Sequence, residues 1–452
     1  MNAGLFGSEP LPPAIRRTIF AGCLGFAIDF FDIYLPVLIL VPVIGYFEPK
    51  GLSANATTTI YYFTIAATLL GRPCGAIIFG HWADKIGRRR TTMISIAGFG
   101  ALTALIAFLP GYSSIGIWSL ILLLGLRFVD GIFMGGEYTS NNTLALEMSP
   151  KDRRGFVGGL MQGAFPIGFA AVSLVASIMF AVTTKEQYAV WGWRLPFLLG
   201  GAIAFLFLLY YRLVPESEMW EATEKSEAPL KEVMSGSHLR SLGQVFLMMS
   251  GFWFVGQPST VLPVIMVQHL HVSSEMSSNT FLVASIILFF AFIGYGLLGQ
   301  MIGRRLTIIL AGLVVLVVGP LLYYMAITHG ISGGSPLGTV VLIAVFHVLM
   351  ISPWGIVTTY ICERFPTHVR ASGYGIGYSV AIIIPSFSGI YLLWLGHFIP
   401  YLYAPIVLLV VAGVLMIVGA LLGPETREVE LHLPDLGHGE LPMRGGAFAR
   451  SA

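Results

Sequence analysis

The stretch Gly80-His81-Trp82-Ala83-Asp84-Lys85-Ile86-Gly87-Arg88-Arg89-Arg90 lies between two long apolar segments and carries most of the charge in this region. Its glycines permit a tight turn, and its arginines favour the inner face of a bilayer. The part Gly87-Arg88-Arg89 recurs as Gly303-Arg304-Arg305, an offset of 216 residues (303 − 87). The same offset relates two further pairs of charged residues: Glu147 to Glu363, and Arg154 to Arg370. One period shared by separate loops predicts two parallel halves with the same fold.

The composition places the chain in a membrane. Of its 452 residues, 56% are hydrophobic and 11% are charged, and the mean hydropathy is +0.81. A helix needs about 20 apolar residues to cross a bilayer. Windows of that length predict twelve spans: 18–46, 57–80, 91–110, 115–147, 156–182, 190–213, 243–268, 276–299, 306–327, 337–361, 371–397 and 401–422. We therefore expect an all-α membrane protein with twelve helices in two pseudo-symmetric six-helix bundles.

The spacing of the spans also predicts the domain organisation. Residues 1–213 and 243–422 are expected to form the two bundles, and 214–242 is expected to be a cytoplasmic linker. The tail 423–452 is rich in Pro, Gly and mixed charges, which predicts disorder. Most of the 25 lysines and arginines fall in the segments that share a side with both termini. The positive-inside rule therefore predicts cytoplasmic termini.

The remaining composition predicts few partners. The net charge of +2 arises from the loop arginines and lysines that set topology, so no nucleic-acid partner is expected. The three cysteines are scattered without the spacing of a metal site or a disulfide pair, and no cofactor is expected. The sequence contains no arrangement of nucleophile, base and orienting group, so we do not expect an enzyme. The expected partners are a small-molecule substrate, protons and the lipid bilayer, for a chain that works as a monomer.

The spacing G-x3-D-K-x-G-R-R in the opening stretch resembles the signature of the major facilitator superfamily. Five further elements are similar to hallmarks of its metabolite:proton symporter family: Gly25-x3-Asp29-Phe30-Phe31-Asp32, Arg72-Pro73-x-Gly75, Arg127-x3-Gly131-x3-Gly135-Gly136-Glu137, Trp191-Gly192-Trp193-Arg194-Leu195-Pro196-Phe197, and Glu363-x-Phe365-Pro366-Thr367-x-Val369-Arg370. The resemblance covers nearly the whole chain. It implies uptake of a small organic solute with protons across a bacterial inner membrane. Members of that family carry dicarboxylates and tricarboxylates, shikimate-like acids, or zwitterions such as betaine and proline.

Two positions depart from the family pattern. Gln300 stands where the repeat of the opening stretch predicts an aspartate, so a gate that needs a carboxylate there is weakened or absent. Asp130 occupies a place in the fourth span where relatives commonly have glutamine. This additional acid argues against an anionic substrate.

Six charged residues lie deep within the predicted spans of the first half: Asp29, Asp32, Arg72, Arg127, Asp130 and Glu137. At 100° per residue, Arg127, Asp130 and Glu137 fall on one stripe of their helix. A charge at the centre of a bilayer costs roughly 2.5–3.5 kcal/mol on insertion scales, so these side chains must face a cavity or one another. Four acids exceed two arginines, and an unpaired buried acid can gain and release a proton. We predict that Asp32 and Glu137 carry the coupling proton, with Asp29 and Asp130 as second choices. The alternative is that the arginines only neutralise the acids and hold the half together.

Other residues are candidates for binding substrate and for gating. Arg127 could bind a substrate carboxylate, and polar or aromatic side chains in or beside broken helices could contact the solute: Gln257, Trp354 and Tyr378. A gate at the cytoplasmic ends is expected to use charge networks that close that side of the membrane. Its predicted members are Asp84, Arg88, Arg89, Arg72, Glu147, Arg154, Glu363 and Arg370.

The sequence thus predicts a proton-coupled symporter that imports a small, carboxylate-bearing metabolite by alternating access. The excess of acids leaves open a zwitterionic or cationic solute of the betaine or amino-acid kind. A proton antiporter or exporter is a weaker alternative, because the glycine and proline run of antiporters is not evident beyond Gly163-x2-Pro166-x-Gly168.

Overall fold

The computed structural model describes residues 11–49, 51 and 54–431, and within these ranges it is built of helices and connecting loops without strands. Six spans belong to the first half: α1 (Pro13–Leu35) continued by η1 (Pro36–Leu40) and η2 (Val41–Tyr46), α2 (Ala54–Ile86), α3 (Arg88–Ile106), α5 (Trp118–Glu147), α6 (Arg154–Gln162) with α7 (Ala164–Val182), and α9 (Arg194–Tyr211). Shorter helices connect them: α4 (Tyr112–Ile115), η3 (Lys151–Arg153), α8 (Lys185–Gln187) and η4 (Tyr188–Gly192).

The second half repeats this order. Its spans are α12 (Gly236–Gln268), α13 (Ser274–Ile302), α14 (Arg304–Leu313) with η5 (Val314–Val318) and α15 (Gly319–Ile331), α16 (Pro336–Ile351) with η6 (Ser352–Ile356) and α17 (Val357–Arg364), α18 (Arg370–Ser379) with η8 (Val380–Ile382), α19 (Ile383–Ser386) and α20 (Ser388–Leu395), and α21 (Pro405–Leu422). Between the halves lie α10 (Glu218–Ala222) and α11 (Pro229–Val233), and the short helices η7 (Thr367–Val369) and η9 (Tyr401–Tyr403) complete the second half.

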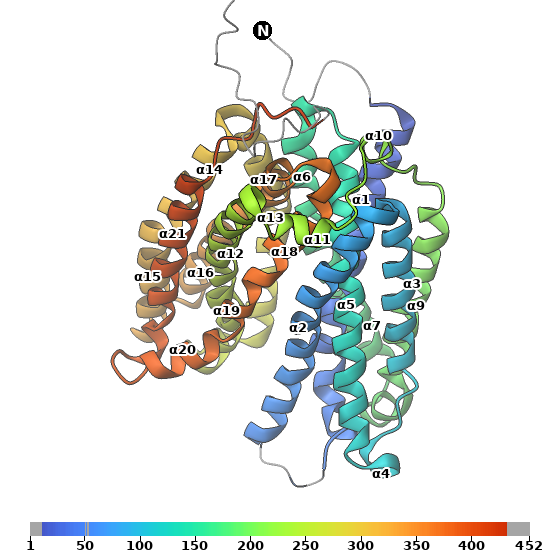
Figure 1. Cartoon of the computed structure of the whole chain (residues 1–452). Helices are drawn as coiled ribbons and strands as arrows, with labels where there is room; N and C mark the ends of the chain where they lie inside the picture. Colours follow the sequence, from blue (N-terminus) through green and yellow to red (C-terminus); the bar gives the residue numbers. More distant parts are fainter. Residues whose placement is uncertain (1–10, 50, 52–53, 432–452) are drawn as a thin grey trace, which may run out of the picture.

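Figure 1 shows the two sets of helices as separate bundles that approach each other at the end where α6, α10 and α17 lie. The bundles contact each other through α2 with α18 and through α6 with α13. In the described part of the chain, nine helical segments are long and apolar enough to cross a membrane. The other three predicted spans are α2, α3 and α12, which pack tightly against α5, α9 and α21. The predicted fold of twelve helices in two bundles is confirmed.

The repeated Gly-Arg-Arg turns have nearly the same backbone in both halves. Gly87 has φ 108° and ψ 155°, and Gly303 has φ 104° and ψ 150°. These positive φ angles are costly for residues with a Cβ atom, so glycine is required at both turns. Each turn ends one helix and starts the next at once, α2 to α3 and α13 to α14. The 216-residue repeat is therefore a structural repeat at this point.

Helices α2 and α5 cross at very close range through glycines. A Cβ atom at Gly71 or Gly75 would overlap the backbone of α5, and one at Gly131 or Gly135 would overlap the backbone of α2. Small residues at such a crossing let polar groups on neighbouring helices reach each other in the membrane. This crossing brings the charged residues of α2 and α5 together.

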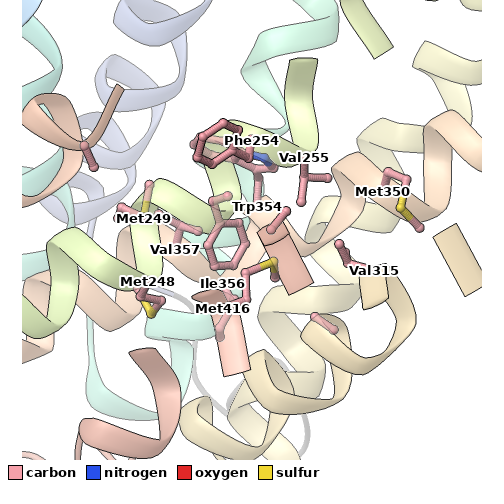
Figure 2. Packing of buried hydrophobic residues seen from close by; sticks show 14 of the residues in the cluster. Met248, Met249, Phe254, Val255, Val315, Met350, Trp354, Ile356, Val357 and Met416 are labelled. Atoms are coloured by element: carbon pink, nitrogen blue, oxygen red, sulfur yellow. The ribbon is translucent and has the colours of Figure 1, made fainter. Parts of the chain in front are cut away.

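The core of the second half is apolar. Figure 2 shows Met248, Met416 and Ile356 from α12, α21 and η6 among its buried side chains, with Trp354 in the same region. The helix that carries Trp354 is broken at η6, as the Ser352-Pro353 pair predicts. Gln257 lies in an unbroken helix, because α12 continues through the proline that follows it.

The linker and the first part of the tail pack against the bundles. Glu425 accepts hydrogen bonds from the backbone N–H groups of Arg304 (2.7 Å) and Arg305 (3.1 Å). Val429 is buried, and its carbonyl accepts from Arg154 Nη1 at 2.9 Å. The disorder expected from residue 423 onward is therefore wrong for 423–431, because this segment supplies partners to helix ends; residues 432–452 lie outside the described residues. The boundaries of the two bundles and the linker stay predictions.

The glycine crossing predicts the effect of one methyl group. The change Gly131→Ala forces a Cβ atom against the backbone of Thr68, and overpacking of this kind costs about 1–3 kcal/mol. We expect a lower unfolding temperature for the purified protein in detergent. The matched control is Gly125→Ala on the same helix, where a Cβ atom meets nothing within 4 Å. Equal unfolding temperatures for the two variants would contradict the close crossing.

Candidate functional site

The first buried ion pair of the first half joins α1 to α2. Arg72 Nη2 lies 2.8 Å from Asp29 Oδ2, and both side chains are almost fully buried. The guanidinium of Arg72 also lies over the ring of Tyr138, with Cζ 4.7 Å from the ring centroid. Arg72 therefore sits between a carboxylate and an aromatic face.

The second ion pair joins α1 to α5. Arg127 Nη1 lies 3.1 Å from Asp32 Oδ2 and 2.8 Å from Asp130 Oδ2, so two acids share one guanidinium. Arg127 Nη2 donates to the carbonyl of Asp32 at 3.4 Å, and Thr103 Oγ1 donates to Asp32 Oδ1 at 2.6 Å. Arg127, predicted to bind substrate, already has both terminal nitrogens engaged by its own half.

Glu137 has no arginine partner in the described part of the chain. Its Oε1 accepts from Asn141 Nδ2 at 2.8 Å, and its Oε2 is buried without a hydrogen-bond partner among the described residues. Asn141 is held in turn by Tyr211, whose hydroxyl donates to Asn141 Oδ1 at 3.0 Å, and by the carbonyl of Gly22, which accepts from Asn141 Nδ2 at 3.1 Å. Glu137 is therefore a fixed, buried acid without an ion-pair partner in the part of the chain that the structure describes.

These contacts place the six predicted charges of the first half. All of them are buried, and Arg127, Asp130 and Glu137 lie on the inward stripe of α5 that their spacing predicts. Arg72, predicted as a gating residue, belongs to this cluster instead. It precedes Asp84 by 12 residues on α2, a rise of about 18 Å, which separates it from the end of the helix.

Aromatic side chains of the second half face this cluster across Tyr138. The ring centroid of Tyr378 lies 5.1 Å from that of Tyr138, 5.4 Å from that of Trp253 and 6.0 Å from that of Trp354. The indole Nε1 of Trp253 donates to the carbonyl of Tyr378 at 2.9 Å. Gln257 lies one turn along α12 and donates to the carbonyl of Trp253 at 3.4 Å. Two of the predicted substrate contacts, Trp354 and Tyr378, are therefore brought together.

A second site lies where the two halves meet, at the end of the molecule that carries the Gly-Arg-Arg turns; we call it the basic end. Arg88 is fully buried there, and it contacts two acids of its own half and a backbone carbonyl of the opposite half. Its Nη1 lies 2.8 Å from Asp84 Oδ1, and its Nη2 lies 3.0 Å from Glu147 Oε1 and 2.6 Å from the carbonyl of Thr367. Glu147 Oε1 also lies 2.7 Å from Arg370 Nη1 of the second half. One buried network therefore connects α2, α3 and α5 of the first half to α18 of the second half.

Asp84 caps the first turn of α18. Its Oδ1 accepts from the backbone N–H of Ala371 at 3.1 Å, and its Oδ2 accepts from that of Ser372 at 2.8 Å. A carboxylate is stabilised at a helix N-terminus by the free N–H groups and the helix dipole. This contact crosses between the halves, so it is made only while the basic end is closed.

The second half repeats the arrangement without the charge. Gln300 corresponds to Asp84 by the 216-residue offset, and its Oε1 accepts from the N–H of Gly155, the first turn of α6, at 3.2 Å. The same oxygen accepts from Arg304 Nη2 at 2.7 Å, and Arg304 Nε lies 3.2 Å from Glu363 Oε2. Glutamine at position 300 therefore lacks the negative charge of an aspartate but still accepts a hydrogen bond from the first turn of α6 in the opposite half.

The predicted gating residues separate by their contacts. Asp84, Arg88, Glu147 and Arg370 share one network, whereas Glu363 pairs with Arg304, and the carboxylates of Glu147 and Glu363 are buried. Two predicted members lie outside the network: Arg89 Nη2 bonds the carbonyl of Arg212 at 2.6 Å, and Arg154 Nη1 bonds the tail carbonyl of Val429. Breaking a buried pair costs about 3–5 kcal/mol, well above the value of an exposed one.

Sequence reasoning missed two glutamates that brace the turns. Glu216 accepts from the backbone N–H groups of Arg88 and Arg89, and Glu425 does the same for Arg304 and Arg305. Burial raises the pKa of Glu216 above its usual value. A signal was available, because Pro215-Glu216-Ser217 recurs as Pro424-Glu425-Thr426 after the last helix of each half.

The sequence is similar to known transporters over most of its length. The family model described as Major Facilitator Superfamily matches residues 22–389. The inner membrane metabolite transport protein YhjE of Escherichia coli is 28% identical over 381 residues, which covers 82% of this chain and 85% of that protein. The proline/betaine transporter of the same organism is 25% identical over 430 residues, with 92% and 84% covered. Among solved structures, the proton:xylose symporter XylE has a TM-score of 0.71 at 19% identity, covering 91% of this chain and 96% of that one, a likeness of fold alone.

Removal of the charge of Asp84 is expected to open the basic end more often. The change Asp84→Asn keeps the size of the side chain but weakens its contact with Arg88 and with α18. A loss of about 1 kcal/mol raises the open population roughly fivefold. The buried thiol of Cys362 reports the opening through its rate of modification by a membrane-permeant maleimide, in a background with Cys23→Ser and Cys74→Ser.

The matched control is Asp152→Asn, an exposed acid near the same end. In this variant, the maleimide should modify the thiol of Cys362 at the native rate. If the thiol reacts equally fast in both variants, Asp84 does not hold the halves together.

Proposed function

This chain belongs to the Major Facilitator Superfamily, and we propose that it imports a small, carboxylate-bearing metabolite together with protons across a bacterial inner membrane. The chain is a multi-pass membrane transporter rather than an enzyme. The observation that carries the proposal is the buried charge imbalance of the first half: three acids, Asp29, Asp32 and Asp130, pair with two arginines, and a fourth acid, Glu137, has no ion pair among the described residues.

Glu137 is the proposed carrier of the coupling proton. Its Oε2 is buried and lacks a partner among the described residues, so ionisation there would leave an uncompensated charge in a low dielectric. The protonated form removes this cost. When water reaches the site from the other side of the membrane, the carboxylate becomes solvated and the proton can leave. Asp130 is the second choice, because it shares Arg127 with Asp32.

Arg72 is the proposed partner of the substrate carboxylate. Among the described residues it forms one ion pair, that with Asp29, and its planar face lies on Tyr138 at the boundary with the second half. Arg127 is less suited, since Asp32 and Asp130 already occupy its terminal nitrogens. A substrate carboxylate that bound Arg72 would compete with Asp29 for this guanidinium and leave more negative charge near Glu137, which favours the protonated form of Glu137 and couples the two events.

Alternating access supplies the transport step. The hydrogen bonds of Asp84 and Gln300 to the opposite halves close the basic end, which we assign to the cytoplasm on the positive-inside rule. Both termini then lie in the cytoplasm. The substrate site sits between the halves, so one chain is sufficient and we propose a monomer.

A zwitterionic or cationic solute is a second candidate, favoured by the aromatic side chains. The ring of Tyr378 lies within contact range of Tyr138, Trp253 and Trp354, and the two tryptophan rings contact each other. Aromatic faces bind quaternary ammonium groups. A betaine-like solute could place its carboxylate on Arg72 and its cation on these rings. Proton release on binding would instead indicate the antiporter alternative.

Substrate-triggered proton flux in proteoliposomes tests the proposal. A pH dye in the lumen reports flux while carboxylates, zwitterions and cations are added in turn. We expect acidification with one charge class, and we expect Glu137→Gln to abolish it, since the amide cannot carry a proton. Exchange of labelled substrate at equal concentrations should persist in this variant.

The control is Glu186→Gln, an exposed acid of the short connecting helix α8, which should leave the flux unchanged. Accumulation of substrate by Glu137→Gln at the native rate would reject Glu137 as the carrier. Alkalinisation in the native protein would reject symport.

A further inference from the structure

A cluster of possible metal ligands lies at the basic end, outside the gate and the transport site. Glu232 comes from α11, His238 from the first turn of α12, and His368 from η7. One ligand atom of each residue lies within 4.8 Å of the other two. The Nε2 atom of His368 is 2.7 Å from Glu232 Oε1, and the rings of His238 and His368 have centroids 6.2 Å apart.

The residue types suit a transition-metal ion. Zinc binds histidine nitrogen and carboxylate oxygen at about 2.0–2.2 Å, which sets neighbouring ligand atoms of a tetrahedral site about 3.3 Å apart. The 2.7 Å separation of Glu232 and His368 must widen slightly, and His238 must move inward. Two histidines and one carboxylate leave a fourth position for water.

The backbone around the three ligands is held in place. Val233 and Val369, beside Glu232 and His368, are fully buried in the core. Ser235 Oγ donates to the carbonyl of Glu232 at 2.9 Å and fixes the end of α11. The ligand side chains nevertheless reach water, with exposed fractions of 15% for His368 and 37% for Glu232. An ion from solution can therefore enter a site whose main chain is already placed.

The position of the cluster connects it to the gate. Thr367, next to His368, accepts from Arg88 Nη2 through its carbonyl, and Arg370 pairs with Glu147. An ion bound by Glu232 and His368 would tie the linker helix α11 to η7 while these contacts are made. Helix α11 contacts α2 of the first half as well as η7 and α18 of the second half, and Figure 1 shows it beside α18, between the two bundles. A bound ion would therefore favour the closed basic end.

We propose that Glu232, His238 and His368 bind Zn²⁺, and that the bound ion slows transport by holding the basic end closed. The binding site stands on the geometry alone. Its effect on transport rests on the proposed function, so the two parts are tested separately.

The binding test uses full-length protein purified with a tag that contains no histidine. Titration with zinc chloride in a calorimeter should give one site per chain, and the ion should raise the unfolding temperature because it binds the folded state. We expect His238→Ala and His368→Ala each to weaken binding about tenfold or more. Glu232→Gln tests the carboxylate with little change in shape.

The matched control is the double change His269→Ala and His271→Ala, which removes a histidine pair of a connecting loop. It should bind Zn²⁺ as the native chain does. Absence of one-site binding, or equal binding by His238→Ala and the native chain, would overturn the proposal. If an alanine variant fails to fold, His238→Gln replaces it, and retained tight binding by that variant has the same meaning.

The transport test adds zinc chloride to proteoliposomes on the side of the basic end. Uptake by the native chain should slow severalfold, whereas His238→Ala should keep its rate with and without the ion. If Zn²⁺ binds without any change in uptake, the proposed effect on transport is wrong, whereas the proposed binding site stands. Failure to find a transported substrate would bear on the proposed function only, because the calorimetric result is independent of it.

Discussion

Four carboxyl groups and two guanidiniums share the buried interior of the first half, and the rest of the structure accommodates this imbalance. A charge at mid-bilayer depth costs roughly 2.5–3.5 kcal/mol, so Asp29 and Arg72 must meet, as must Asp32, Asp130 and Arg127. These pairs require α1, α2 and α5 to approach closely, which the glycines at the crossing of α2 and α5 permit. Among the described residues, Glu137 is then left with one side-chain partner, the amide of Asn141. The same packing that removes charge from lipid thus creates a group suited to proton exchange.

The same arrangement of residues closes the basic end in both halves, but one half uses a charged acceptor and the other a neutral one. In both halves a Gly-Arg-Arg turn is braced by a later glutamate, and an acceptor before the turn caps a helix of the opposite half. The first half uses the carboxylate of Asp84, and the second half uses the neutral amide of Gln300. Desolvation of a charge is costly, so the neutral contact lowers the penalty of closing. The two contacts therefore contribute unequally to the closed state.

Much of the fold could be predicted from the sequence, because hydropathy and the 216-residue offset are properties of the chain alone. The site was predictable where helical spacing decides it, as for the stripe that contains Arg127 and Glu137. The ion pair of Arg72 with Asp29 could not be predicted, because it depends on how α1 and α2 pack against each other. The proposed ligands Glu232, His238 and His368 could not be predicted from the sequence. The two histidines are 130 residues apart (368 − 238), and only the fold brings them together.

The most direct test of the account is the protonation state of Glu137 in the membrane. Infrared difference spectroscopy of the reconstituted protein detects the carbonyl stretch of a protonated carboxyl group, and comparison with Glu137→Gln assigns the band. The account predicts that the native protein shows this band at neutral pH, that the variant lacks it, and that the band changes when substrate is added. A spectrum in which native protein and variant have the same protonated-carboxyl absorption would contradict the central claim.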